Sequence, residues 1–291
     1  MRLAVLCSPD SWYFEDLTRA SRGRHQLVRV DFAGLASEYD GQATKFSCGE
    51  HRLDGLDAVL VRTMPPGSLE QVVYRMDLLQ GLHQQGTLVV NPPRCVEAAV
   101  DKYLCTARIA AAGLRTPRTF VCQTADQSLE AYRQLGGDVV VKPLFGGEGR
   151  GIFRVQDEDL ASRAFHTLQQ LKSVVYMQEF IPHEGYDVRL FLLGDRIFGM
   201  RRSNPRDFRT NVSRGANTEP FPLDDHLERL ARSASEAVGA IVAGVDVLPG
   251  RDGHLYVIEV NAVPGWKALA RTLNLDIASL LLDEIQARVR K

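Results

Sequence analysis

The sequence contains few cysteines, no long apolar segment and almost no net charge. Its five cysteines show no CxxC spacing, so neither a metal-binding cysteine cluster nor a disulfide framework is favoured. No segment approaches the ~18 consecutive apolar residues that a membrane-spanning helix needs. The 35 Lys and Arg residues are balanced by 36 Asp and Glu residues, which leaves a formal charge of -1. We therefore expect a cytoplasmic protein that binds no membrane and makes no direct contact with nucleic acid.

The composition is that of a globular protein, with 45% hydrophobic and 24% charged residues. A length of 291 residues suggests two domains or one large one. Short apolar runs predict strands at 2–6, 27–32, 56–62 and 87–91. Between the last two, apolar residues at helical spacing predict a helix over 68–84. Strands that alternate with helices favour a parallel sheet. Asn91-Pro92-Pro93 then interrupts the chain, because consecutive prolines cannot continue a helix or a central strand, and we place the first boundary near residue 95.

The middle of the chain is predicted to surround a glycine-dense loop. A helix over 96–112 should end at Gly113, since glycine is typical of the position after a helix. A strand, a helix and a strand are expected next, at 116–121, 127–135 and 138–143. The loop itself reads Phe145-Gly146-Gly147-Glu148-Gly149-Arg150-Gly151. The apolar segment at 152–155 is short, which favours a strand over a helix.

This loop has the composition of a phosphate-binding loop, because glycine backbones can surround phosphate oxygens with N–H groups. It lacks the Gly-Lys-Ser/Thr ending of a P-loop, and a strand is expected where a dinucleotide-binding motif requires a helix. Two strands joined by such a loop are typical of a flexible lid over the phosphates of ATP. Lys142 is then a candidate phosphate ligand, and Lys102 is a second one if the fold brings them together. A plain hairpin with a mobile tip is the alternative.

Two acidic residues near the C-terminus are expected to face each other across a hairpin. Asp252-Gly253 is a strong signal for a two-residue turn, and this turn would place Asp246 directly opposite Glu259. Alternation along the strand puts Asn261 on the same face as Glu259. Opposed side chains lie about 5 Å apart, so the carboxylates should repel each other unless a cation lies between them. Oxygen ligands of this kind suit Mg²⁺, which is usually shared with substrate phosphates.

The alternative is that Asp246 and Glu259 face solvent and bind no metal. Their neighbours are apolar, which indicates that the hairpin is buried on at least one face and favours metal binding. The predicted register depends on a regular hairpin, and Pro249-Gly250 could introduce a β-bulge. The seven histidines, including His183, show no metal-binding spacing and are interpreted as surface or structural residues.

These motifs, in this order, resemble the ATP-grasp superfamily and, within it, the RimK-type ligases that add glutamate to a carboxylate. The resemblance covers essentially the whole chain. It is carried by Asn91-Pro92-Pro93, Asp101-Lys102, Val141-Lys142-Pro143, Gln178-Glu179-Phe180-Ile181, Asp187-Val188-Arg189, Asp207-Phe208-Arg209-Thr210-Asn211, Arg214-Gly215 and Glu259-Val260-Asn261.

The resemblance implies an α/β fold with α+β character in its C-terminal part, namely an ATP-grasp fold preceded by an N-terminal parallel-sheet domain. The implied domains are an N-terminal α/β domain at 1–95, a central small domain with the glycine lid at 96–180, and a C-terminal domain with the Mg²⁺ and acceptor sites at 181–291. ATP would bind between the last two domains.

The resemblance also implies roles for individual residues. The nucleotide would contact Lys102, Lys142, the lid glycines Gly146, Gly147, Gly149 and Gly151, the adenine-binding strand Gln178, Glu179, Phe180 and Ile181, the ribose-side residue Asp187, and Arg209, Thr210 and Asn211. The ligands of Mg²⁺, or of Mn²⁺ as an alternative, would be Asp246, Glu259 and Asn261.

Arginines are concentrated between residues 189 and 214. The planar guanidinium matches carboxylate and phosphate groups, and a ligase must hold two carboxylate-bearing substrates and a developing acyl phosphate. Arg189, Arg202 and Arg214 are therefore the candidate catalytic residues. A solvated basic loop is the alternative for each arginine taken singly.

The expected activity is ATP-dependent formation of an amide bond through an acyl phosphate. The implied substrates are L-glutamate and a carboxylate-bearing acceptor, with a small coenzyme such as a tetrahydromethanopterin-type pterin favoured. The alternatives are a glutamate ligase that modifies the C-terminus of a ribosomal protein, a D-alanine- or glutathione-type dipeptide ligase, a small-molecule kinase, and an ATP-binding regulatory module without turnover. Family analogy implies a homo-oligomer.

Overall fold

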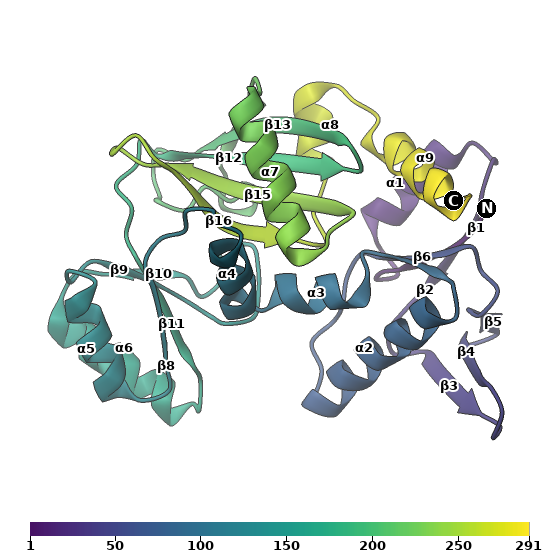
Figure 1. Cartoon of the computed structure of the whole chain (residues 1–291), viewed down its shortest axis with the longest axis horizontal. Helices are drawn as coiled ribbons and strands as arrows, with labels where there is room; N and C mark the ends of the chain where they lie inside the picture. Colours follow the sequence, from purple (N-terminus) through teal and green to yellow (C-terminus); the bar gives the residue numbers. More distant parts are fainter. Residues whose placement is uncertain (291) are drawn as a thin grey trace.

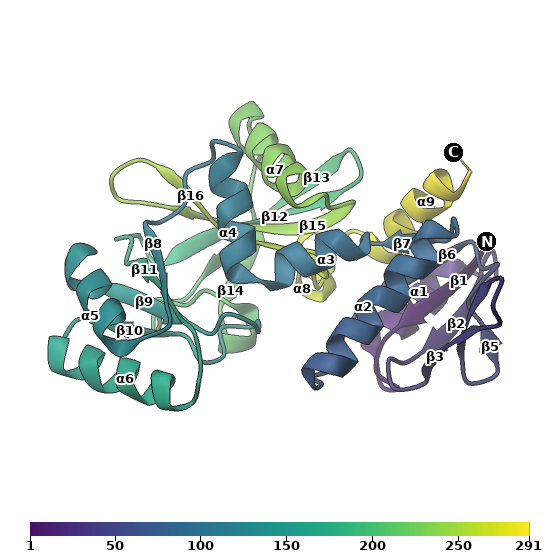
Figure 2. The ribbon, with the colours of Figure 1, turned by 60° about the horizontal axis from the view of Figure 1, so that its bottom comes forward.

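The computed structural model describes residues 1–290, which form three parts arranged along the long axis of the molecule (Figure 1). The N-terminal part lies at one end and the central part at the other, with the C-terminal sheet between them. The last helix returns to the N-terminal part, where it packs against the first helix (Figure 2). Within residues 1–290, no helix combines the length and apolar character that crossing a membrane requires.

The N-terminal part is built on a four-stranded parallel sheet, which confirms the prediction from alternating strands and helices. Its strand order is β2-β1-β6-β7, with β1 at Arg2–Leu6, β2 at Gln26–Val30, β6 at Ala58–Val61 and β7 at Leu88–Val90. Helices α1 and α2 cover it, at Trp12–Ser21 and Leu69–Gln84. A small antiparallel sheet has no counterpart in the sequence-based prediction; it is formed by β3 (Leu35–Tyr39), β4 (Thr44–Cys48) and β5 (His51–Arg52).

The central part is a four-stranded antiparallel sheet with the order β10-β9-β11-β8. The strands are β8 (Thr119–Cys122), β9 (Val139–Lys142), β10 (Phe153–Val155) and β11 (Val175–Glu179), and the helices are α5 (Ala125–Gln134) and α6 (Glu158–Gln170). A strand does follow the glycine loop, and it pairs with the strand before the loop. The predicted strand–loop–strand unit is therefore present.

The C-terminal part is a five-stranded antiparallel sheet with the order β14-β13-β12-β15-β16. The strands are β12 (Tyr186–Leu193), β13 (Arg196–Ser203), β14 (Asn217–Pro220), β15 (Val242–Pro249) and β16 (Leu255–Asn261). The helical segments are the short 3-10 helix η1 (Val212–Arg214), α7 (Asp225–Val238), α8 (Lys267–Leu273) and α9 (Ile277–Val289).

The single helix predicted over 96–112 is wrong, because the structure has two helices there. These are α3 (Pro93–Val100) and α4 (Lys102–Ala111). Asp101 between them has extended backbone angles, and its side chain accepts a hydrogen bond from Leu104 N at 3.1 Å. An aspartate in this role starts a new helix, and it places Lys102 at the first position of α4. Gly113, with φ +76°, follows the helix as predicted.

The hydrophobic cores do not divide the chain into three equal units. The central part has a core of its own that includes Val139, Phe165 and Met177. The N-terminal and C-terminal parts share two cores, one of which joins Leu3 to Leu281. The domain bounds 1–95, 96–180 and 181–291 remain a prediction.

Asn91, at the end of β7, ties the parallel sheet to the C-terminal sheet. Its buried side chain donates to Val242 O at 2.6 Å and also to Ala262 O. Its Oδ1 accepts from Ile241 N at 2.7 Å and from Val242 N at 2.9 Å. One side chain thus satisfies four backbone groups from two segments of the C-terminal part, at 241–242 and at 262, which explains why an asparagine stands before the two prolines.

We predict that Asn91→Ala lowers the free energy of unfolding by about 3 kcal/mol, since each buried polar group left without a partner costs about 1–3 kcal/mol. Gln85→Ala is the control, because the side chain of the exposed Gln85 makes one hydrogen bond, to Thr44 O, and its loss should cost under about 1 kcal/mol. Urea unfolding measures both. Equal losses in the two variants would contradict the role given to Asn91.

Candidate functional site

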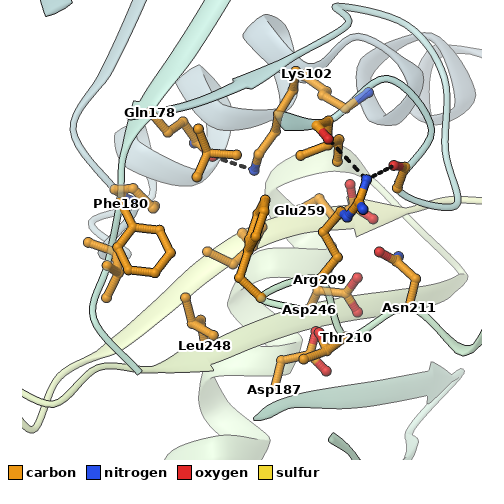
Figure 3. A pocket seen from close by; sticks show the side chains of 18 of the residues that line it. Lys102, Gln178, Phe180, Asp187, Arg209, Thr210, Asn211, Asp246, Leu248 and Glu259 are labelled. Carbon is orange, nitrogen blue, oxygen red and sulfur yellow. Dashed lines mark hydrogen bonds between the residues drawn. The ribbon is translucent and has the colours of Figure 1, made fainter. Parts of the chain in front are cut away.

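A cleft between the central and C-terminal sheets gathers most of the residues singled out in the sequence (Figure 3). It encloses about 890 Å³, including space open to solvent. The predicted residues that line it are Lys102, Lys142, Gly146, Gly147, Gly149, Gln178, Glu179, Phe180, Ile181, Asp187, Arg202, Arg209, Thr210, Asn211, Asp246 and Glu259. Four further predicted residues lie outside the lining: Gly151, Arg189, Arg214 and Asn261.

Two lysines from different elements meet in this cleft below the glycine loop. Lys142 is the last residue of β9, and its Nζ donates to Gln178 Oε1 at 2.5 Å. Lys102 begins α4, and its Nζ donates to Gly146 O at 2.7 Å. Burial lowers the pKa of both lysines, that of Lys142 to about 8. Two cations held together away from water favour an anionic ligand such as a phosphate.

One end of the cleft is aromatic. The Phe180 and Phe208 rings meet edge to face, with centroids 6.2 Å apart. The Arg154 guanidinium lies 3.4 Å from the centroid of Phe180, and Asp138 accepts two hydrogen bonds from it at 2.7 and 2.5 Å. Phe180 N also donates to Asp138 O at 2.9 Å. Because Asp138 and Arg154 flank the glycine loop in the sequence, these contacts fix the aromatic wall relative to the two lid strands.

The hairpin of β15 and β16 places Asp246 directly opposite Glu259, which confirms the predicted pairing. The predicted two-residue turn is wrong, because Gly250 N donates to His254 O at 2.8 Å and leaves a three-residue loop between them. The register then shifts at a bulge where Ile258 has no partner on β15. The additional loop residue and the unpaired Ile258 shift the register in opposite directions, so Asp246 and Glu259 still face each other. The bulge also turns Ile258 and Glu259 toward the same cleft.

Asp246 is buried among arginines. Its Oδ1 lies 2.8 Å from Arg189 Nε and 2.9 Å from Arg202 Nη2, but neither contact has hydrogen-bond geometry. Arg202 donates two hydrogen bonds to Asp187, at 2.7 and 2.5 Å. Burial, which the two arginines oppose, raises the pKa of Asp246 to about 6. A buried acceptor short of hydrogen bonds can accept a further cation.

Glu259 is held as an anion beside this group. Its Oε1 accepts a hydrogen bond from Asn261 Nδ2 at 2.8 Å. Burial acts to raise the pKa of Glu259, but Arg189, Asn261 and the two cleft lysines outweigh it and lower the pKa. Among residues 1–290, no third His, Cys, Asp or Glu completes a metal-binding cluster here. An ion at this position would need oxygen ligands from a substrate or from water.

The glycine loop is held down by the loop at 204–216. Arg209 Nη1 donates to Ile152 O at 3.0 Å, and Arg214 Nη2 donates to Gly149 O at 3.1 Å. Gly149 has φ +70°, and a Cβ there would lie 2.6 Å from Asn211 Oδ1. Glycine at 149 therefore permits the close approach. Arg214, a candidate catalytic residue, contacts the lid in this structure.

Sequence reasoning missed nine lining residues, namely Pro117, Val140, Glu148, Arg150, Ile152, His183, Phe208, Leu248 and Ile258. Leu248 could have been found, because it lies two residues from Asp246 and shares its face of β15. Ile258 could not, because only the bulge turns it into the cleft. His183 is a lining residue rather than a surface one; its ring lies 5.8 Å from that of Phe180, and burial lowers its pKa.

Two family models match consecutive parts of the chain. The prokaryotic glutathione synthetase N-terminal domain matches residues 5–96, and the RimK-like ATP-grasp domain matches residues 99–285. The chain belongs to the RimK-like ATP-grasp family. The predicted resemblance and fold are thereby confirmed, as is the enzyme class, an ATP-dependent acid–amino-acid ligase.

Similar proteins with curated names are also ligases. The tetrahydromethanopterin:alpha-L-glutamate ligase of Methanosarcina acetivorans is 28% identical over 97% of each chain, and that of Methanocaldococcus jannaschii is 32% identical over 80% of each. The alpha-aminoadipate–LysW ligase LysX of Saccharolobus solfataricus is 31% identical over 72% of this chain and 78% of its own.

Solved structures show the same fold. The ATP-grasp ligase PsnB complexed with its minimal precursor has a TM-score of 0.79 at 23% identity and covers 98% of both chains. The RimK domain ATP-grasp protein from Sphaerobacter thermophilus has a TM-score of 0.73 at 26% identity, with 98% of this chain and 100% of that chain covered.

We predict that Gly149→Ala loosens the lid of this RimK-like protein, because alanine is strained at φ +70° and its Cβ would press on Asn211. Gly147→Ala is the matched control, since its Cβ would meet no atom within 4 Å. Trypsin cleavage after the exposed Arg150 reports lid opening. We expect several-fold faster cleavage in Gly149→Ala alone; identical rates in both variants would show that this contact does not hold the lid.

Proposed function

We propose that this RimK-like protein uses ATP and Mg²⁺ to join L-glutamate to a carboxylate of a small acceptor, a pterin coenzyme being favoured. The observation that carries the proposal is the meeting, in one cleft, of the buried Lys102, the partly buried Lys142, a glycine lid and the opposed carboxylates Asp246 and Glu259. The names of the alpha-L-glutamate ligases similar to this chain support the substrates. All five cysteines are free thiols, which supports a reducing, cytoplasmic location.

The two ends of the cleft suit different parts of ATP. A flat purine suits the aromatic end, where the guanidinium of Arg154 stacks on the ring of Phe180 and keeps it in place. The phosphates suit the opposite end, where Lys102 and Lys142 lie below the glycine loop. We assign Asp187 to the ribose side, as the family resemblance implies.

The residues at the hairpin fit a magnesium ion. Asp246, Glu259 and Asn261 offer hard oxygen donors, and Asp246 Oδ1 lacks hydrogen bonds. Two carboxylates leave several coordination positions for phosphate oxygens and water, which is the usual arrangement for Mg²⁺ and also admits Mn²⁺. When bound, the ion would neutralise charge on the transferring phosphoryl group.

The proposed reaction has two steps. The acceptor carboxylate takes the γ-phosphoryl group of ATP to give an acyl phosphate and ADP, and the glutamate amine then displaces phosphate. Both steps develop negative charge, which positioned cations stabilise. Arg214 can do so once a phosphate oxygen replaces the lid carbonyl as its acceptor. Arg209 can offer Nη1 in the same way, while its Nε and Nη2 stay bonded to Asp207. Arg189 and Arg202 hold Asp246 in place for the metal.

The decisive test is ADP release with ATP, Mg²⁺ and L-glutamate against a panel of acceptors, followed by the mass of the product. The panel contains tetrahydromethanopterin, a peptide with a ribosomal-protein C-terminus, D-alanine and a γ-glutamyl dipeptide. We expect glutamate-dependent ADP release with the pterin and a product heavier by one glutamyl unit. ADP release that does not depend on glutamate would indicate a kinase. A product formed only with D-alanine or with the dipeptide would indicate a dipeptide ligase. Binding of ATP without turnover would indicate a regulatory module.

We predict that Glu259→Ala abolishes Mg²⁺-dependent ADP release, because it removes one of the two carboxylates that would bind the ion. Glu236→Ala is the control, since Glu236 is exposed on α7. Thermal melting should show both variants folded. Full activity in Glu259→Ala would overturn the metal assignment.

We predict that affinity for ADP without Mg²⁺ declines as the pH rises above about 8. Lys142 is charged below its pKa of about 8, and only the charged lysine attracts phosphate, so the attraction weakens above that pH. Lys142→Arg stays charged throughout and should show no such decline. Titration calorimetry from about pH 7 to about pH 9.5 compares the two; parallel curves would exclude Lys142 as the titrating contact.

A further inference from the structure

Aromatic rings and cations fill the junction between the N-terminal and C-terminal parts. The rings of Tyr13 in α1 and Trp266 meet edge to face, with centroids 4.7 Å apart. The Arg62 guanidinium lies over both rings, 4.6 Å from the Tyr13 centroid and 4.4 Å from that of Trp266. Lys267 Nζ lies 4.9 Å from the ring of Trp12, which in turn packs on Tyr13. Two cations thus stack on three aromatic rings.

Arg62 is a buried cation without a counter-ion. Its exposure is 6%, its Nε has no hydrogen-bond partner, and no carboxylate among residues 1–290 forms an ion pair with it. Its Nη2 donates to Pro264 O at 2.9 Å. Removing a charge from water costs several kcal/mol, and stacking on aromatic rings returns only about 0.5–2 kcal/mol. An anion brought by a ligand would supply the missing charge.

The junction adjoins the carboxylate pair of the cleft. Pro264, which accepts the hydrogen bond from Arg62, packs against Gly244, where a Cβ would lie 3.1 Å from Pro264 Cβ. The same Cβ would collide with Arg189 Nη1. Arg189 contacts Asp246 directly. Four successive contacts therefore lead from Arg62 to the proposed metal ligand.

The Tyr13 hydroxyl is a second polar group of this junction, after Arg62 Nε, that lacks a protein partner. It lies against Gly265, where a Cβ would be 2.5 Å away, and no group among residues 1–290 hydrogen-bonds to it. Burial raises the pKa of Tyr13; Arg62 and Arg189 oppose this shift, and Glu148 in the lid adds to it. The phenol is therefore a protonated donor. Its neighbour Gly265 follows Pro264, and Pro264 lies against Gly244, which also lies against Arg189.

We propose that the Tyr13 hydroxyl donates a hydrogen bond to the carboxylate of the acceptor, and that Arg62 is a positioning residue that holds the ring and contributes the unpaired positive charge. The N-terminal part thereby supplies one wall of the acceptor site, facing the lid and Arg189. This inference rests on the proposed ligase function and adds the residues that recognise the anionic end of the acceptor.

The test compares the KM for the acceptor with the KM for ATP, using the panel acceptor that supports the fastest ADP release. Tyr13→Phe removes only the hydroxyl and should raise the acceptor KM about tenfold, the value of a hydrogen bond to a charged group, with the ATP KM unchanged within about twofold. Arg62→Met should raise the acceptor KM as well, and Arg62→Lys should recover part of the loss. Tyr39→Phe is the control, because Tyr39 is 71% exposed on β3.

An unchanged acceptor KM in Tyr13→Phe would overturn the inference, even if Arg62→Met melted at a lower temperature, because that pattern describes a purely structural arginine. Equal increases in both KM values would overturn it too. If Arg62→Met does not fold, Tyr13→Phe decides alone. Absence of acceptor-dependent ADP release by the unaltered protein would instead refute the proposed function, and this inference with it.

Discussion

Two carboxylates, the buried Asp246 and the partly buried Glu259, face each other across β15 and β16 and determine how the rest of the site is built. Like charges this close, shielded from water, repel strongly. The structure balances them with cations from four elements, because Arg189 comes from β12, Arg202 from β13, Lys142 from β9 and Lys102 from α4. The central and C-terminal sheets are thereby linked by charge as well as by chain connections.

The cations of the cleft already have acceptors before any nucleotide arrives. Lys102 donates to Gly146 O, Lys142 to Gln178, and Arg214 to Gly149 O. Binding of a triphosphate would therefore exchange one set of acceptors for another, and its affinity would be the difference between the two sets. Because two of these acceptors are lid carbonyls, the exchange would also release the lid to settle over the phosphates.

Local patterns predicted the parallel sheet, the strand after the glycine loop and the pairing of Asp246 with Glu259. They failed where two local effects compete or cancel. Asp101 ends one helix and caps the next, which helical spacing alone cannot show. The three-residue loop and the bulge at Ile258 offset each other, so the correct pairing followed from a wrong turn. Arg62 has no sequence signal, because its partners come from α1 and from the segment before α8.

The hydrophobic cores divide the chain into one packed unit, made of the N-terminal and C-terminal parts, and a separate central part. Shared cores and the four hydrogen bonds of Asn91 make the N-terminal and C-terminal parts a single packed unit. The central part has its own core, and its contacts with that unit include hydrogen bonds between the lid and the loop at 204–216. A part that shares no apolar core with its neighbour can move without unfolding either one. The central part can therefore move while Tyr13, Arg62 and the carboxylate pair keep their relative positions.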